Sequence, residues 1–108
     1  MKIAGSYDVE HAPPGSFVAR PFLDGDQCKV RIIRLAAGQP LPPHRHGASD
    51  LMLYDADGQG QLETPTGSVT FTRGDIAFYR GDEELPVRNA GDGELTLLAF
   101  LAPKFGTA

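Results

Sequence analysis

Short runs of aliphatic, aromatic and β-branched residues, separated by turn residues, make up most of the chain beyond residue 16. The runs cover residues 17–23, 28–36, 51–56, 59–64, 68–72, 75–80, 85–89 and 94–102. Glycine, asparagine and aspartate lie between them, and these residue types tolerate the backbone conformations of tight turns. Regularly spaced short strands of this kind predict an all-β fold of about eight or more antiparallel strands.

The same pattern predicts little helix. No window of about a dozen residues shows the 3.6-residue periodicity of an amphipathic helix, and the 13 glycines and 9 prolines are spread along the chain. Residues 1–16 are mostly polar and predict an N-terminal arm, so residues 17–108 are expected to form a single domain. A small domain of this type hides its strand edges in a closed barrel or a jelly roll.

The last run, residues 94–102, is apolar at nearly every position. A strand with this composition is usually covered on both faces. The core covers one face, and a second subunit or an overlapping segment would cover the other. We therefore expect a homodimer.

Composition narrows the class of protein. The 108 residues suffice for one core, and the net charge of −4 with scattered basic residues argues against a nucleic-acid partner. No apolar run approaches the roughly 18 residues of a membrane helix. The start of the chain lacks an apolar export segment, and Cys28 is the single cysteine. These features predict a cytoplasmic protein that does not bind membranes.

Two histidines are the first candidates for chemistry. His44 and His46 flank Arg45 directly after Pro42-Pro43. Because side chains alternate along an extended segment, both imidazoles are expected on the same side. They could bind a metal or a ligand, or they could be polar residues at the junction of a loop and a strand.

The spacing around these histidines resembles the motifs of the cupin superfamily, which are small RmlC-like jelly-roll barrels. The first motif begins with a glycine, which five intervening residues separate from the His-x-His pair, and ends with a second glycine. The second motif follows a Gly-Asp corner and ends with asparagine. The matching positions are Gly38, His44, His46, Gly58, Gly67, Gly74, Asp75 and Asn89. The resemblance covers residues 28–102 and implies a single cupin jelly-roll β-barrel.

In metal-binding cupins the ion is held by both histidines of the first motif, its glutamate, and the histidine of the second motif. Here Leu51 occupies the glutamate position and Leu85 the second histidine position, with Asp50 one residue early. Asp50 would point away from the barrel interior unless a β-bulge between His46 and Leu53 turned it inward. With that bulge, His44, His46 and Asp50 would form a two-histidine, one-carboxylate face of the kind that suits Fe(II).

The resemblance thus implies one divalent transition metal (Fe, Ni, Zn or Mn) or none. His11 could supply a third imidazole if the N-terminal arm folded over the barrel mouth. Leu51 and Leu85 instead favour a drier, more apolar mouth, because burial of leucine is favourable by roughly 1.5–3 kcal/mol. They are therefore candidate ligand-binding residues.

Three further residues are candidates for ligand binding. Arg34 and Arg88 lie in predicted strands and could anchor an anionic group through their planar guanidinium groups. Tyr54 could line the pocket, although it could equally contact the core or a second subunit.

Asp55 has the strand phase of the neighbouring leucines, where an inward carboxylate would be costly. It is either a functional acid or a sign that the strand ends at Tyr54, and the turn-like residues that follow favour the early end.

Two functional hypotheses follow, because this fold serves enzymes and binding proteins alike. The favoured hypothesis is a cupin that binds a small molecule and has a weak or partial divalent-metal site. The alternative is a metal-dependent enzyme of the dioxygenase, isomerase or lyase type that acts on a small oxygen-bearing metabolite.

Overall fold

The computed structural model describes residues 1–103 and is nearly all β. One 3-10 turn, η1, spans Ser6–Asp8. The strands are β1 (Phe17–Asp24), β2 (Lys29–Leu35), β3 (Asp50–Asp57), β4 (Gln59–Thr64), β5 (Gly67–Thr72), β6 (Ile76–Tyr79), β7 (Val87–Asn89) and β8 (Leu95–Ala102). Each predicted strand has a counterpart. Residues 104–108 of the predicted domain lie outside the described residues.

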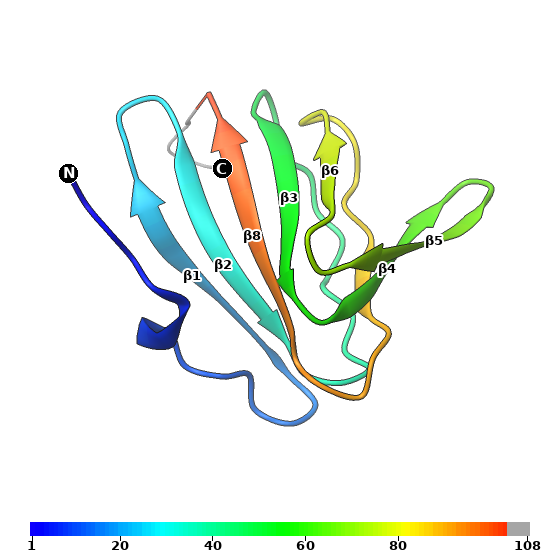
Figure 1. The fold of residues 1–108 in the computed structure, drawn as a ribbon. Helices are drawn as coiled ribbons and strands as arrows, with labels where there is room; N and C mark the ends of the chain where they lie inside the picture. Colours follow the sequence, from blue (N-terminus) through cyan, green and yellow to red (C-terminus); the bar gives the residue numbers. More distant parts are fainter. Residues whose placement is uncertain (104–108) are drawn as a thin grey trace.

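The strands form two antiparallel sheets that face each other across the core (Figure 1). The larger sheet has the order β1-β2-β8-β3-β6 and the smaller one β5-β4-β7. The chain crosses from β3 to β4 at Gly58, whose φ is 95°. A Cβ atom at this position would lie 2.6 Å from the Glu94 carbonyl oxygen. Only glycine fits this backbone conformation and this close approach, so it fixes the crossing between the sheets.

The core lies between the two sheets and is built mainly from leucine. Its buried members are Ile33, Leu35, Leu41, Leu51, Leu53, Leu62, Phe71, Leu85, Val87, Leu95, Leu97, Ala99 and Leu101. The inward residues alternate with outward residues along β3 and β8, as the two-residue period of a strand requires.

Asp55 corrects one of the sequence predictions. The strand does not end at Tyr54, because β3 continues to Asp57 and buries Asp55 completely. The Asp55 amide donates a hydrogen bond to the carbonyl oxygen of Asp75 (3.0 Å), and the Gly74 amide donates to the carbonyl oxygen of Asp55 (2.8 Å). These backbone bonds to the turn between β5 and β6 hold the strand in place despite the cost of burying the carboxyl group.

Asn89 has a structural role. Its side-chain amide is buried and donates hydrogen bonds to the carbonyl oxygens of Leu35 (2.9 Å), Ala36 (3.1 Å) and Gly93 (2.7 Å). Its side-chain oxygen accepts a hydrogen bond from the Gly91 amide (2.9 Å). Asn89 therefore joins the end of β2 to the loop before β8.

The N-terminal arm is fastened to the outer face of the larger sheet. Arg34 Nη1 donates to Glu94 Oε1 (3.1 Å) and Thr96 Oγ1 (3.0 Å). Its Nη2 donates to the carbonyl oxygen of Ser6 in the arm. His11 Nδ1 lies 2.8 Å from Glu94 Oε1. Arg34 therefore lies on the opposite face of β2 from the core.

Beyond the arm, the outer face keeps a row of exposed apolar side chains. Phe78, Met52 and Phe100 are 55%, 47% and 39% exposed. Met52 is the cross-strand partner of both phenylalanines, so the three residues form one continuous row, here called the outer row. The homodimer expected from the composition of β8 stays a prediction, and the outer row is the surface on which it would depend. Among residues 1–103, no helix has the length and apolar character needed to cross a membrane.

Candidate functional site

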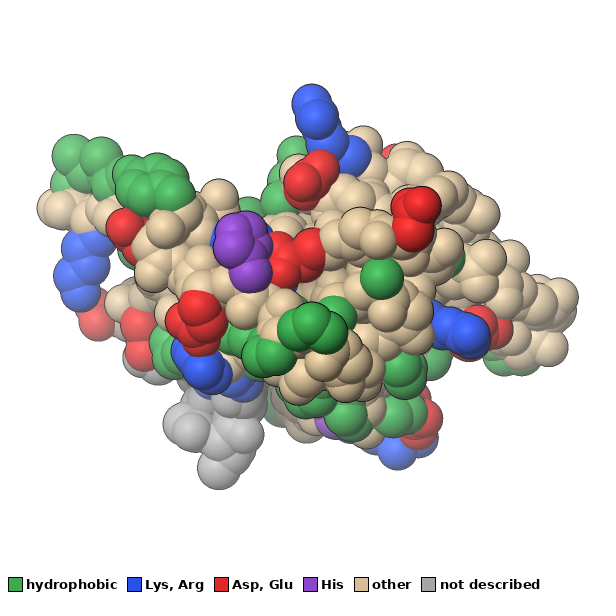
Figure 2. Space-filling model, turned by 90° about the horizontal axis from the view of Figure 1, so that it is seen from below, with side chains coloured by type: hydrophobic (Ala, Val, Ile, Leu, Met, Phe, Trp, Pro, Cys, Tyr) green, Lys and Arg blue, Asp and Glu red, His purple; other side chains and the backbone are tan. Residues whose placement is uncertain are grey.

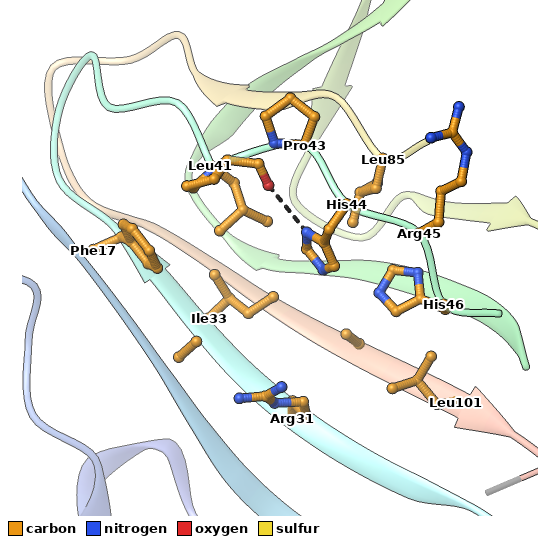
Figure 3. A pocket seen from close by; sticks show the side chains of 13 residues that line it. Phe17, Arg31, Ile33, Leu41, Pro43, His44, Arg45, His46, Leu85 and Leu101 are labelled. Atoms are coloured by element: carbon orange, nitrogen blue, oxygen red, sulfur yellow. Dashed lines mark hydrogen bonds between the residues drawn. The ribbon is translucent and has the colours of Figure 1, made fainter. Parts of the chain in front are cut away.

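A cavity of about 410 Å³ lies between the larger sheet and the segment that carries both histidines (Figure 3). Its volume falls within the range of about 300–1,000 Å³ that is typical of small-molecule sites. Apolar residues from β1, β2 and β8 and from the loops make up most of the lining. The four ionisable lining residues are Arg31, His44, Arg45 and His46.

Backbone hydrogen bonds hold the histidine segment in place. The Leu85 amide donates to the carbonyl oxygen of His44 (3.1 Å), and the His46 amide donates to the carbonyl oxygen of Gly81 (2.9 Å). A Cβ atom at Gly81 would lie only 2.0 Å from the Gly47 carbonyl oxygen. The close approach that positions His46 therefore requires glycine at position 81.

A hydrogen bond to the backbone fixes which nitrogen of the His44 ring carries the hydrogen. His44 Nδ1 lies 3.0 Å from the Pro42 carbonyl oxygen. A carbonyl oxygen can only accept, so Nδ1 carries the hydrogen and Nε2 of the neutral ring can accept one. The ring centroids of His44 and His46 are 4.6 Å apart with an interplanar angle of 63°. The two imidazoles therefore lie side by side in the cavity wall, so both can contact the same ligand.

His46 is the more deeply buried of the two, with 9% of its surface exposed. Its Nδ1 atom has no hydrogen-bond partner among residues 1–103. Burial lowers the pKa of His46 below 6.5, and the positive charges of His44, Arg31 and Lys29 lower it further. The ring is therefore neutral at pH 7. An unsatisfied buried polar atom typically costs about 1–3 kcal/mol, and a bound ligand could remove this cost.

The described residues do not fit a tightly held metal ion. Asp50 is exposed, and β3 pairs with β8 in regular register from Asp50 to Asp55, so no bulge turns Asp50 inward. Within residues 1–103, no group of three or more histidine, cysteine, aspartate or glutamate side chains could hold an ion. His44 and His46 are thus two donors where a zinc enzyme typically has three. The Arg31 charge nearby disfavours a cation further.

The other predicted site residues lie in several places. Leu85 is buried and lines the cavity, whereas Leu51 is buried in the core and does not line it. Tyr54 lies on the outward face of β3, and Arg88 is exposed on β7. Arg34 is buried on the outer face, where it binds the N-terminal arm. His11 contacts Glu94 and does not join the histidine pair.

Sequence reasoning missed Arg31. This residue lies in β2, two and four positions before Ile33 and Leu35, so all three side chains share the inward face. Arg31 lines the cavity with Ile33. The available signal was the alternation of β2, but Val30 and Ile32 make the outward face equally apolar. The pattern alone could not show which arginine of β2 points inward.

Comparison of the structure with solved structures identifies the fold. An RmlC-like cupin protein from Desulfovibrio desulfuricans superimposes with a TM-score of 0.84 over 97% of this chain and 99% of that chain, at 20% sequence identity. This chain therefore has the fold of an RmlC-like cupin. A double-stranded β-helix protein from Klebsiella pneumoniae also has a TM-score of 0.84, with 16% identity over 95% of this chain and 90% of that chain.

A cupin domain from Bordetella pertussis is more similar in sequence, at 29% identity, and has a TM-score of 0.65. The match covers 90% of this chain and 99% of that chain. Comparison of the sequence with models of protein families gave no match, and comparison with curated proteins gave none either. The structural likeness establishes the fold, and the function must be argued from the cavity.

Proposed function

We propose that this cupin binds a small molecule in the cavity lined by His44 and His46. One observation carries the proposal. His46 Nδ1 is buried at the cavity wall without a hydrogen-bond partner among the described residues. A buried polar atom without a hydrogen bond destabilises the folded state. A ligand that forms a hydrogen bond with His46 Nδ1 would remove this energetic cost.

The rest of the cavity suits such a ligand. An apolar lining supplies affinity, and a few convergent polar groups supply orientation. His44 Nε2 can accept a hydrogen bond, because Nδ1 already donates to Pro42. Leu85 takes the position of a metal ligand in metal-binding cupins and adds apolar surface to the wall.

A metal-dependent enzyme is the second candidate function. The observation in its favour is the 4.6 Å separation of the two imidazole rings. An ion such as Fe, Ni, Zn or Mn at His44 and His46 would take its remaining ligands from water or from a substrate. With two protein donors and a nearby guanidinium group, such an ion would be held weakly.

The proposal can be tested by NMR on ¹⁵N-labelled protein without a histidine tag. Small apolar molecules that bear one polar group are titrated into the wild type, into His46→Leu, and into His11→Leu as the matched control. We expect shifts in the amide signals of cavity-lining residues and affinity at least about ten-fold weaker in His46→Leu, because one hydrogen bond at a buried atom is lost. Shifts confined to residues away from the cavity would contradict the proposal.

Metal analysis separates the two candidate functions. The binding function predicts protein with far less than one ion per chain, whose melting temperature does not rise when divalent ions are added. An ion that binds only the folded state must raise the melting temperature. Near-stoichiometric metal that is lost in His46→Ala would favour the enzyme instead.

A further inference from the structure

We propose that the ligand is a small carboxylate, with its charged group between Arg31 and His46 and its apolar part against the cavity wall. The inference rests on the proposed function, because it names the chemical class of molecule that the same cavity binds.

The charges around the cavity differ from those of the chain as a whole. The sequence contains 14 acidic and 10 basic residues. On the face shown in Figure 2, acidic and basic side chains are interspersed. By contrast, all four ionisable residues that line the cavity are bases. A protein of net negative charge thus lines one apolar cavity with no acidic side chain and with two guanidinium groups, whose positive charges attract an anion.

The two arginines at the cavity have different roles. Arg45 Nη2 lies 3.4 Å from Glu84 Oε2, and Arg45 Nε donates to the Asp82 carbonyl oxygen (3.0 Å). Its side chain points away from the cavity (Figure 3). Arg31 has no ion pair or hydrogen bond with the described residues that would compete with a ligand. Arg31 is therefore the cationic group that remains available.

Arg31 and the histidines lie on opposite walls. Arg31 extends from β2, and His46 lies across the cavity on the segment before β3 (Figure 3). A guanidinium group donates two parallel hydrogen bonds to a carboxylate. His46 Nδ1, when it carries the ring hydrogen, supplies a further donor. The two residues together match a monoanion with planar oxygens.

Other ligand charges fit less well. A cationic ligand would be repelled by Arg31, and a neutral ligand would leave the guanidinium group without a counter-charge in a largely apolar site. The remaining lining, which includes Phe17, Ile33 and Leu85, requires an apolar body on the ligand. A small carboxylic acid with an aliphatic or aromatic skeleton satisfies all three conditions.

The test compares carboxylates with carboxamides of the same skeleton. The pairs are benzoate with benzamide, phenylacetate with phenylacetamide, and hexanoate with hexanamide. Dissociation constants are measured by NMR titration for wild type, Arg31→Gln, Arg31→Lys and Arg88→Gln. Arg88 is a matched control because it is a strand arginine that is exposed on β7 and does not line this cavity.

We expect wild type to bind the carboxylates about ten- to hundred-fold more tightly than the amides, which is the usual effect of hydrogen bonds to a charged group. Arg31→Gln should remove this preference, Arg31→Lys should keep part of it, and Arg88→Gln should keep all of it. Thermal melting of each variant, compared with wild type, establishes that a lost preference does not come from unfolding.

Two other outcomes have different meanings. Equal affinity for carboxylates and amides, unchanged in Arg31→Gln, would overturn the carboxylate inference and leave the proposed binding function intact. Binding of neither class at millimolar concentration would overturn the carboxylate inference and contradict the proposed function as well.

Discussion

His46 and Asp55 both face the interior of the barrel and both have buried polar atoms without a hydrogen-bond partner among residues 1–103. Their surroundings differ. His46 borders the cavity and is 9% exposed, whereas Asp55 is fully buried on β3, opposite Leu97. The imidazole has adjacent space that a ligand can occupy, and the carboxyl group is enclosed by protein.

The two groups also differ in their protonation at neutral pH. Burial raises the pKa of Asp55 to about 6. The backbone amide of Asp57 lowers this pKa slightly, although neither carboxyl oxygen of Asp55 has a hydrogen-bond partner among residues 1–103. The negative charges of Asp57 and Asp75 raise the pKa further. Burial lowers the pKa of His46, so that ring is neutral at pH 7, whereas the Asp55 carboxyl group keeps its proton only below about pH 6. A buried unpartnered polar group therefore indicates a binding site only where space for a ligand lies beside it.

The largest expected effect is on stability through Asp55. Between the unfolded value of 3.8 and about 6, the folded chain holds a proton that the unfolded chain has lost, so stability falls as pH rises. The shift corresponds to about 3 kcal/mol. We expect Asp55→Asn to be more stable than wild type by about this amount above about pH 7, with a smaller difference at about pH 4.

Urea unfolding at several pH values measures this effect. Asp50→Asn is the matched control, because Asp50 is exposed on the same strand. Its stability should follow that of wild type at every pH. Parallel pH profiles for wild type and Asp55→Asn would show that Asp55 is not the enclosed acid described here.

A smaller effect on stability is expected at Glu94, a carboxylate that is fully engaged in hydrogen bonds and ion pairs. Burial alone would raise its pKa, but hydrogen bonds from His11 and the Ala12 amide, together with the charges of His11 and Arg34, lower it below 4.5. This stabilisation is present above pH 4.5 and is lost as pH falls through the folded value. Glu94→Gln should lose roughly 1.5–3 kcal/mol at neutral pH.

Thermal or urea unfolding of Glu94→Gln tests the contrast with Asp55. The exposed Glu63→Gln serves as control and should change stability by no more than about 0.5 kcal/mol. If Glu94→Gln were as stable as wild type at neutral pH, the network that fastens the N-terminal arm would not contribute to folding.

The smallest change in the stability of a single chain is expected for substitutions in the outer row, because its side chains are exposed. If the predicted homodimer forms through this surface, Met52→Glu should convert a dimer to a monomer in sedimentation experiments. Val69→Glu is the control, because Val69 is 51% exposed on β5 in the other sheet. A wild-type protein that is monomeric at all concentrations would rule out this interface.

The strands could be predicted from sequence because turn residues separate the runs of aliphatic, aromatic and β-branched residues. The alternation of inward and outward residues was clear where one face is polar. In β3 this alternation placed Asp55 inward, yet the turn-like residues that follow favoured an early end of the strand. In the structure the strand continues to Asp57, and Asp55 forms backbone hydrogen bonds with Gly74 and Asp75.

The candidate site was only partly predictable. His44, His46 and Leu85 line the cavity, and their motif positions indicated this. The sequence makes Arg34 a candidate only because it lies in a predicted strand. Both faces of β2 are apolar, so periodicity does not show whether Arg34 or Arg31 points inward. The tertiary structure decides between them. β2 pairs with β8, the N-terminal arm binds Arg34 on the outer face, and Arg31 lies on the cavity side.

A crystal structure of the protein with the tightest-binding carboxylate tests the central claim most directly. We predict that its carboxylate group lies within hydrogen-bond distance of the Arg31 guanidinium group and of His46 Nδ1, with its apolar part against Leu85. A carboxylate that points toward solvent, or a ligand bound elsewhere on the protein, would contradict the account.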